Sequence, residues 1–332
     1  MALKTAKEYI DSLRELGTRV YMFGEKVDNC VDHPLIRPSI NCIAMTYALA
    51  HDERYKDLMT TTSHLTGRTI NRFCHVHQSS EDLVKKVKML RLIGQKTASC
   101  FQRCVGMDAF NAVYSTTYEV DEKYGTHYHE NFKNFLIMVQ DEDLVVDGAM
   151  TDPKGDRSLP PHAQPDPDLF LRVVERREDG IVVRGAKAHQ TGSINSHWHL
   201  FMPTIAMGEA DKDYALSFAC PSNAEGIYIS TAARAATPAS WKVAASTPAT
   251  TSSAVRKPLL FWTMSLSPMS TSSSTVSMTS PALWLSVLQA ITARATAAAR
   301  SALATFSSVL LLSLPSTMAL RRQAQSRTSS LR

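Results

Sequence analysis

The chain has 332 residues, with 36 Lys and Arg against 31 Asp and Glu, which gives a formal net charge of +5. Its six cysteines are widely spaced, which excludes a small secreted disulfide scaffold, and the first residues lack the charged start and apolar stretch of a secretory signal. The most apolar run, residues 307–314, is too short to span a bilayer. We therefore expect a cytoplasmic protein with no membrane partner.

The composition changes abruptly after Gly226. All 31 acidic residues and all 13 glycines lie at or before this position, and no Asn, His or Cys follows it. The first 226 residues hold 26 of the 36 Lys and Arg, so they carry a charge of −5 and the remainder carries +10. A segment without glycine or acidic partners is poorly suited to tight turns and to a packed core. We expect residues 230–332 to be a largely unstructured tail.

The genetic code suggests an origin for this tail. Residues 231–242, back-translated and read one base earlier, permit a string that contains glycine, cysteine and charges of both signs. We therefore interpret residues 230–332 as out-of-frame translation. A genuine tail of low complexity, rich in Ser, Thr and Ala, is the alternative.

The N-terminal part of the chain has helical patterns. Thr5 and Glu8 form a capping-box signature, and apolar residues at helical spacing follow them. Ser39 and Ser80 are candidate N-caps of two further helices, the second of which runs toward Cys100. We predict a helical N-terminal domain over residues 1–140.

Beyond residue 140 the pattern changes to that of strands. Branched and aromatic residues cluster in four short stretches, residues 144–146, 169–174, 181–183 and 214–219. The sequence Glu178-Asp179-Gly180 predicts a turn between two of them. We predict a β domain over residues 141–229, and hence an α+β protein.

Two cysteines stand out near the end of the third predicted helix. We place residues 95–106 on one helix, where the i,i+4 spacing of Cys100 and Cys104 puts both thiols on one face, with Cβ atoms about 5–6 Å apart. This separation suits two corners of an iron–sulfur cluster. Two buried core cysteines are the alternative. Arg103, next to Cys104, would lower the pKa of a thiolate ligand.

Two polar turns are candidate ligand sites. In residues 151–158, Gly155 would let the backbone approach a ligand, and Lys154 and Arg157 would offset phosphate charge. Residues 188–192 end a predicted strand with several short hydrogen-bonding side chains. A polar surface turn explains each stretch taken singly.

Two pairs of histidines have the spacing of residues on one side of a strand. They are His75 with His77, and His197 with His199. Metal ligation is one interpretation, and ordinary hydrogen-bonded histidines are the other.

Six stretches of the chain are informative when they are taken together. They are residues 21–25, 33–39, 63–67, 95–106, 147–157 and 172–192. These stretches resemble the 4-hydroxyphenylacetate 3-hydroxylase family of flavoproteins, which are built like acyl-CoA dehydrogenases, and the resemblance covers residues 1 to about 229. The cysteine pair separates the 4-hydroxybutyryl-CoA dehydratases of this family from the hydroxylases, which lack a cluster.

The resemblance implies a fold, cofactors and a reaction. It implies FAD, a [4Fe-4S] cluster, a helical N-terminal domain, a middle β-barrel and a C-terminal helical bundle, assembled as a homotetramer. The implied reaction is radical dehydration of an acyl-CoA substrate, 4-hydroxybutyryl-CoA, to crotonyl-CoA, with an associated vinylacetyl-CoA isomerase activity.

The resemblance also implies roles for residues. Cys100 and Cys104 would be cluster ligands, and Thr191 would donate a hydrogen bond to the flavin ring. Two further ligands, a His and a Cys, would fall at Thr292 and Ala299, and the family's base and helical bundle would lie in the lost C-terminal part, so we expect this chain to be inactive. The residues implied to line the flavin are Thr151, Asp152, Lys154, Gly155, Asp156, Arg157, His189, Gln190, Thr191 and Gly192.

Two other functions remain open. One is a two-component flavin monooxygenase that acts on a phenol and needs no cluster. The other is a non-catalytic protein whose basic tail contacts nucleic acid or a membrane. The tail lacks a basic cluster and interleaved aromatic residues, so we expect no nucleic-acid partner.

Overall fold

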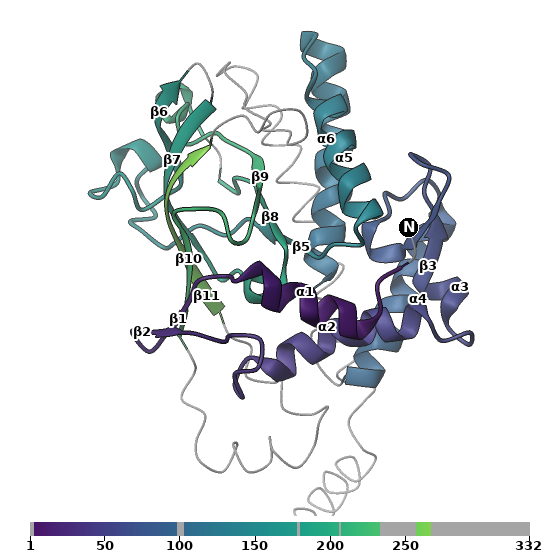
Figure 1. The fold of residues 1–332 in the computed structure, drawn as a ribbon. Coiled ribbons are helices and arrows are strands. Elements are labelled where there is room, and N and C mark those ends of the chain that lie inside the picture. Colours follow the sequence, from purple (N-terminus) through teal and green to yellow (C-terminus); the bar gives the residue numbers. More distant parts are fainter. Residues whose placement is uncertain (1–2, 98–102, 178–179, 206, 233–256, 267–332) are drawn as a thin grey trace, which may run out of the picture.

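Helices and strands occupy different sides of the molecule. Figure 1 shows β6, β7, β10 and β11 on one side, α3 to α6 on the other, and α1 and β5 between them. The computed structural model of the chain describes residues 3–97, 103–177, 180–205, 207–232 and 257–266.

The helical side contains the elements predicted from the N-terminal pattern. Its α-helices are α1 (Ala6–Leu16), α2 (Arg37–Ala50), α3 (Lys56–Met59), α4 (Ser80–Thr97), α5 (Cys104–Tyr124) and α6 (Tyr128–Asp141). Four short strands come between these helices in the sequence, β1 (Val20–Met22), β2 (Glu25–Val27), β3 (Thr60–Thr62) and β4 (Thr69–Asn71), together with the 3-10 turn η1 (Arg72–Cys74). Of these, β1 and β2 lie on the strand side of the molecule, next to β10 (Figure 1).

The sequence predicts the start of a helix correctly where the capping residues are close neighbours in the chain. The capping box is confirmed: Glu8 N donates to Thr5 Oγ1 at 3.2 Å, and Thr5 N donates to Glu8 Oε2 at 2.7 Å. α2 begins at Arg37, so the prediction that Ser39 caps it is wrong. The hydroxyl of Ser39 instead accepts a hydrogen bond from Asn195 in the β half.

The β half is built from two sheets. Its strands are β5 (Val146–Ala149), β6 (Arg172–Arg177), β7 (Gly180–Ala188), β8 (Trp198–Phe201), β9 (Phe218–Pro221), β10 (Ile227–Ala232) and β11 (Lys257–Leu266). One sheet has the order β2-β1-β10-β11-β7-β6, the other has the order β5-β8-β9, and β3 and β4 form a separate pair. Among the residues that the structure describes, no sheet closes into a barrel, so the incomplete β-barrel domain that the resemblance implies for residues 141–229 is corrected to open sheets.

Part of the predicted unstructured tail belongs to a sheet. Residues 230–232 complete β10, and residues 257–266 form β11, which pairs antiparallel with β10 and with β7. These two stretches have regular structure, and the prediction that the tail is largely unstructured stays a prediction for the rest. The other residues of 230–332 lie outside the described part of the chain.

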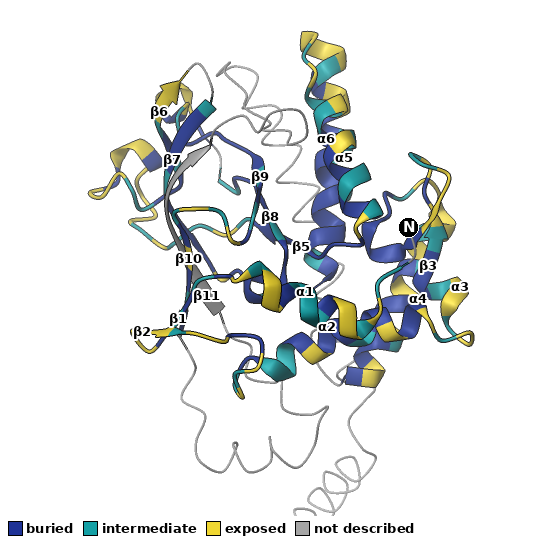
Figure 2. Ribbon diagram, viewed as in Figure 1, coloured by how far each residue is buried: buried dark blue, intermediate teal, exposed yellow. Residues whose placement is uncertain are grey.

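The core is continuous across the predicted domain boundary at residue 140. β1, which we expected in the helical domain, pairs parallel with β10, so that Val20 lies opposite Ile229. Tyr9 of α1 and Tyr47 of α2 stack with ring centroids 4.8 Å apart and pack with Ile229 and with residues of both larger sheets. Figure 2 shows α5 and α6 buried where they meet the rest of the molecule and exposed at their far ends.

The start of α5 packs backbone to backbone against β5. A Cβ atom on Gly106 would collide with the carbonyl oxygen of Val146, and one on Gly148 would lie 2.9 Å from Cγ1 of Val105. The two glycines therefore allow an approach that no side chain could fit. This contact places the first turn of α5 directly against the strand that leads to residue 151.

His197 links α1 to the start of the three-stranded sheet. Its Nδ1 accepts from Val145 N at 3.0 Å, so the ring proton lies on Nε2, which is 2.9 Å from Ser12 Oγ. The side chain is 5% exposed, and burial lowers the pKa of His197 to about 3. His197 is thus a neutral, hydrogen-bonded core histidine, as the second of our two interpretations has it.

None of the helices in the described ranges combines the length and the apolar character needed to cross a bilayer.

We predict that Gly106→Ala lowers the free energy of unfolding by about 1–3 kcal/mol, because the added methyl group overpacks the contact with β5. Urea unfolding of the full chain measures this change. Ser115→Ala on the same helix is the control, since the Ser115 hydroxyl donates to carbonyls of its own helix. Equal unfolding midpoints for the two variants would contradict the close contact.

We predict that His197→Gln flattens the dependence of stability on pH. A histidine whose pKa is lowered in the folded state contributes fully above about pH 6.5 and loses its contribution as the pH falls toward the folded value of about 3. Below pH 6.5 the unmodified chain should lose about 1.4 kcal/mol per pH unit more than the variant. Unfolding measured between pH 7 and pH 5 tests this, and parallel curves would count against it.

Candidate functional site

The two predicted ligand turns meet at one end of the sheets. β5 ends at Ala149 and leads into residues 151–158, and β7 ends at Ala188. Ala188 N donates to Thr151 O at 2.8 Å, and Gln190 Nε2 donates to the same oxygen at 3.1 Å. The structure therefore brings together two stretches that are separate in the sequence.

The predicted residues of these turns differ in exposure. The side chains of Lys154 and Arg157 are exposed and make no ion pair with any residue in the described ranges. His189 is exposed and has the left-handed backbone angle φ of 62°, and Thr191 is half-buried. Gln190 is buried and holds the carbonyls of Thr151 and Ala188, so it supports the turns from within.

Three of the predicted residues have structural partners. A Cβ atom on Gly155 would collide with Gln164 and Leu169, so this glycine allows close packing of the turn, and its expected role in ligand approach stays a prediction. Asp156 accepts hydrogen bonds from Ser158, which lower the pKa of Asp156. Gly192 is buried and leads into the 3-10 turn η3 (Ser193–Asn195).

Asp152 lies inside the protein and is bound to a lysine that sequence reasoning missed. Its carboxylate accepts from Lys187 Nζ at 2.6 Å and from Thr204 Oγ1 at 3.2 Å. The side chains of Asp152 and Lys187 are 8% and 4% exposed. Asp152 thus interacts with Lys187 and Thr204 inside the protein. No motif in the sequence marks Lys187 as its partner.

The exposed groups of the turns suit an anionic, hydrogen-bonding ligand. Lys154 and Arg157 present two positive charges, and Thr191 presents a hydroxyl whose one described acceptor, the carbonyl of His189, is 3.4 Å away. A phosphate-bearing cofactor with hydrogen-bonding ring atoms, such as a flavin nucleotide, fits this donor set.

The predicted cysteine site is described only in part. α4 ends at Thr97, and α5 begins at Cys104 with Arg103 as its N-cap, so one helix through residues 95–106 is wrong. Cys104 is 8% exposed and packs with apolar residues of α2, α4 and α5. Cys100 lies outside the described residues, as do Thr292 and Ala299.

Arg103 is buried and directed away from solvent. Its guanidinium donates to Asp143 Oδ1 at 3.0 Å, to Thr46 Oγ1 at 3.1 Å and to Cys74 Sγ at 3.6 Å. It also lies over the ring of Tyr47, 4.5 Å from its centroid. The guanidinium of Arg103 therefore interacts mainly with Asp143 and the groups around it. The expected lowering of the pKa of Cys104 is not its principal effect.

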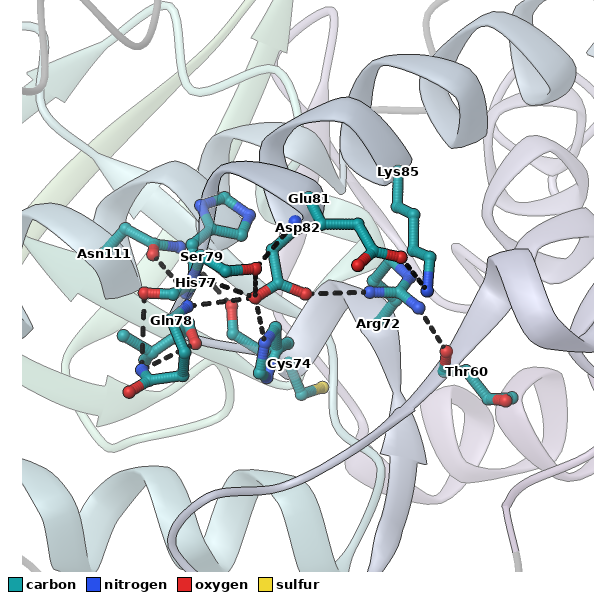
Figure 3. Close-up of polar contacts among 12 residues, drawn as sticks. Thr60, Arg72, Cys74, His77, Gln78, Ser79, Glu81, Asp82, Lys85 and Asn111 are labelled. Atoms are coloured by element: carbon teal, nitrogen blue, oxygen red, sulfur yellow. Dashed lines mark hydrogen bonds and ion pairs between the residues drawn. The ribbon is translucent and has the colours of Figure 1, made fainter.

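A second polar cluster lies at the start of α4, and Figure 3 shows how its side chains converge on Asp82. Asp82 accepts from Gln78 N at 3.0 Å and lies 3.3 Å from both Arg72 NH1 and His75 Nε2. Burial raises the pKa of Asp82, but the interactions with Gln78, His75 and Ser79 outweigh it and lower the pKa to about 2.

The histidines of this cluster do not make a metal site with the described residues. The ring centroids of His75 and His77 are 6.2 Å apart. Burial lowers the pKa of His77 to about 4. In the described ranges, no three His, Cys, Asp or Glu side chains are placed to hold a metal ion. The hydrogen bonding of His75 instead fits the interpretation as an ordinary buried histidine.

Comparison with known proteins finds a matching family model and related sequences. A family model described as 4-hydroxyphenylacetate 3-hydroxylase N terminal matches residues 5–254. The chain is 74% identical over 227 residues to the 4-hydroxybutyryl-CoA dehydratase/vinylacetyl-CoA-Delta-isomerase of Clostridium aminobutyricum, a match that covers 68% of this chain and 46% of the relative. It is 31% identical over 225 residues to the 4-hydroxyphenylacetate 3-monooxygenase oxygenase component of Thermus thermophilus, again covering 68% and 46%.

Solved structures of the same two kinds of enzyme have a fold similar to that of this chain. The chain superimposes on an oxygen-tolerant archaeal 4-hydroxybutyryl-CoA dehydratase from N. maritimus with a TM-score of 0.80 and 41% identity, covering 93% of this chain and 60% of that one. The oxygenase component of 4-hydroxyphenylacetate 3-monooxygenase complexed with FAD has the same fold, with a TM-score of 0.71 and 24% identity over 93% and 62% of the two chains. The chain spans about half the length of the curated relatives that it matches.

Because the family model covers most of the chain and both turns of the candidate site, the chain belongs to the 4-hydroxyphenylacetate 3-hydroxylase family.

Proposed function

We propose that this chain corresponds to the flavin-binding N-terminal part of a 4-hydroxybutyryl-CoA dehydratase with vinylacetyl-CoA isomerase activity. The observation that carries the proposal is the 74% identity over 227 residues to a relative with that name. The monooxygenase relative is 31% identical over a similar length, so the dehydratase is favoured over the hydroxylase alternative.

The residues of the two turns have distinct tasks in this proposal. Lys154 and Arg157 bind the pyrophosphate of FAD, since both carry exposed charges next to the start of the turn. Thr191 donates a hydrogen bond to the flavin ring from the facing turn. Gln190 keeps the turns together through Thr151 O, which fixes the spacing between the phosphate and ring contacts. An FAD complex of a protein with the same fold supports the choice of cofactor.

A flavin is needed for a physical reason. The hydrogen on C3 of 4-hydroxybutyryl-CoA is not acidic, so a base acting alone would face a prohibitive barrier. When bound, FAD would supply the one-electron chemistry that makes this hydrogen removable. The contribution of this chain is to hold and orient the cofactor and to bury its surroundings against water.

The finer architecture is also part of the proposal. We infer an acyl-CoA dehydrogenase-like enzyme in which the open sheets belong to a middle β domain, followed by a helical bundle and assembled as a homotetramer. The match to 46% of the dehydratase leaves more than half of that relative to supply the bundle and the catalytic base. The out-of-frame origin of residues 230–332 remains our interpretation of the composition.

The cluster does not fit the described residues of this chain. Cys104 is the one described member of the predicted ligand set, and the described ranges contain no group of three metal-binding side chains around it. The positions of the two C-terminal ligands hold Thr292 and Ala299, neither of which is a thiolate or imidazole donor. We therefore assign no step of the reaction to a cluster in this chain.

We predict that the chain, purified without oxygen, contains no stable [4Fe-4S] cluster and does not dehydrate 4-hydroxybutyryl-CoA. Two cysteines leave two corners of the cluster without strong protein ligands. Iron and acid-labile sulfide assays on the purified chain check this. About four irons per chain, the number in such a cluster, would overturn the ligand assignment.

A frame-restored chain, read one base earlier after residue 229, should gain both the cluster and dehydration of 4-hydroxybutyryl-CoA. In that protein we predict that Cys104→Ser abolishes iron content and activity together while the fold is retained. Cys42→Ala is the control, because Cys42 is a second buried thiol of the same core cluster and is outside the predicted ligand set. A restored protein that hydroxylates 4-hydroxyphenylacetate and contains no iron would favour the monooxygenase instead.

A further inference from the structure

Lys187 is a buried lysine near the C-terminal end of β7, where the strands of both sheets lead toward the candidate flavin turns. The residue is 3% exposed, although lysines are almost never fully buried without partners. We propose that Lys187 is a positioning residue for the flavin, which acts through Asp152 to fix the turn that begins at Thr151. This inference rests on the proposed function for the identity of the ligand.

The ammonium group of Lys187 uses all three of its hydrogen-bond donors. It donates to Met150 O at 3.1 Å, to Asp152 Oδ1 at 2.6 Å and to Met202 O at 3.0 Å. Met150 directly follows β5, and Met202 directly follows β8. One side chain therefore joins the C-terminal ends of three strands from two different sheets.

The partners of Lys187 hold the turn on both sides of Thr151. Met150 O precedes this residue and the Asp152 carboxylate follows it, while Thr151 O itself accepts from Ala188 N and Gln190 Nε2. Asp152 is also held by Thr204 Oγ1 at 3.2 Å. The first residues of the phosphate-binding turn are thus fixed before the chain reaches Lys154.

A contact that only stabilised the fold would not need the chemistry of the Lys187–Asp152 pair. A buried ion pair is often no more stabilising than apolar residues of the same volume, because both charges lose their hydration. A tetrahedral ammonium can bind two carbonyl oxygens and a carboxylate at once, whereas the planar guanidinium of arginine has a different donor geometry. The arrangement at Lys187 is therefore suited to setting the relative positions of three backbone segments.

Two variants of the full chain separate positioning from charge balance. Lys187→Met removes the ammonium and keeps a side chain of similar length. The double variant Lys187→Met with Asp152→Leu also removes the buried carboxylate that the single variant leaves unpaired. Lys26→Met on β2 is the control, because Lys26 is exposed and far from the turn in the sequence. Circular dichroism and thermal unfolding report the fold of each protein.

Two readouts follow the turn itself. FAD affinity is measured by the quenching of flavin fluorescence during titration with protein. Trypsin cleavage after Lys154 and Arg157, both exposed, is followed by mass spectrometry and reports the mobility of the turn. We expect Lys187→Met to weaken FAD binding by about tenfold or more and to accelerate both cleavages, because a turn that is not preorganised must be ordered when the ligand binds.

The double variant decides between the two roles. If Lys187 positions the turn, the double variant regains thermal stability but retains weak FAD binding and rapid cleavage. Recovery of FAD affinity and slow cleavage in the double variant would show that only charge balance matters, and would overturn the proposal. Unchanged affinity and cleavage in Lys187→Met would overturn it as well.

Failure of the flavin assignment gives a different result. An unmodified chain that binds no FAD at any concentration would refute the flavin site of the proposed function. Faster cleavage after Lys154 and Arg157 in Lys187→Met would still support the positioning role toward the turn, and equal cleavage rates would refute it.

Discussion

The buried guanidinium of Arg103 joins the helical and β halves of the protein. It binds Asp143, which lies between α6 and β5, together with Thr46 of α2 and Cys74 of η1. Two charges removed from water in this way are stable only when both remain paired, and loss of one partner of such a pair typically costs about 3–5 kcal/mol. The start of α5, the end of α6 and the entry to β5 therefore depend on one interaction.

This junction organises the candidate site. Arg103 is the N-cap of α5 and Cys104 is its first residue, so the helix that carries the predicted ligand starts at the ion pair. The next turn of α5 contacts β5 through Gly106 and Gly148, and β5 leads to the turn that Lys187 holds. The ion pair, the close contact of α5 with β5 and the hydrogen bonds of Lys187 therefore form one continuous series of contacts from Arg103 to the turn.

The sequence predicted best what is decided locally. The start of α1 needed only Thr5 and Glu8. The two turns were recognised as turns because glycine and short polar residues mark them, while their role in ligand binding stays a prediction. The start of α5 at Cys104 was not predicted, and Arg103 at its N-cap binds Asp143, which is 40 positions away and is linked to it by no local pattern. Lys187 was missed because its partners Met150, Asp152 and Met202 are distant in the sequence, and nothing local marks a lysine on a strand as buried.

The parallel pairing of β1 with β10 has a consequence for how the chain folds. Val20 pairs with Ile229, and Ile229 N donates to Arg19 O at 2.9 Å, so the two strands are separated by more than 200 positions. During synthesis β1 has an open edge until nearly all of the described chain has left the ribosome. Pairings of such high contact order form slowly, and an unpaired strand edge favours association with other chains. Nascent chains that stop before β10 should therefore be prone to aggregation even though their helical core is already encoded.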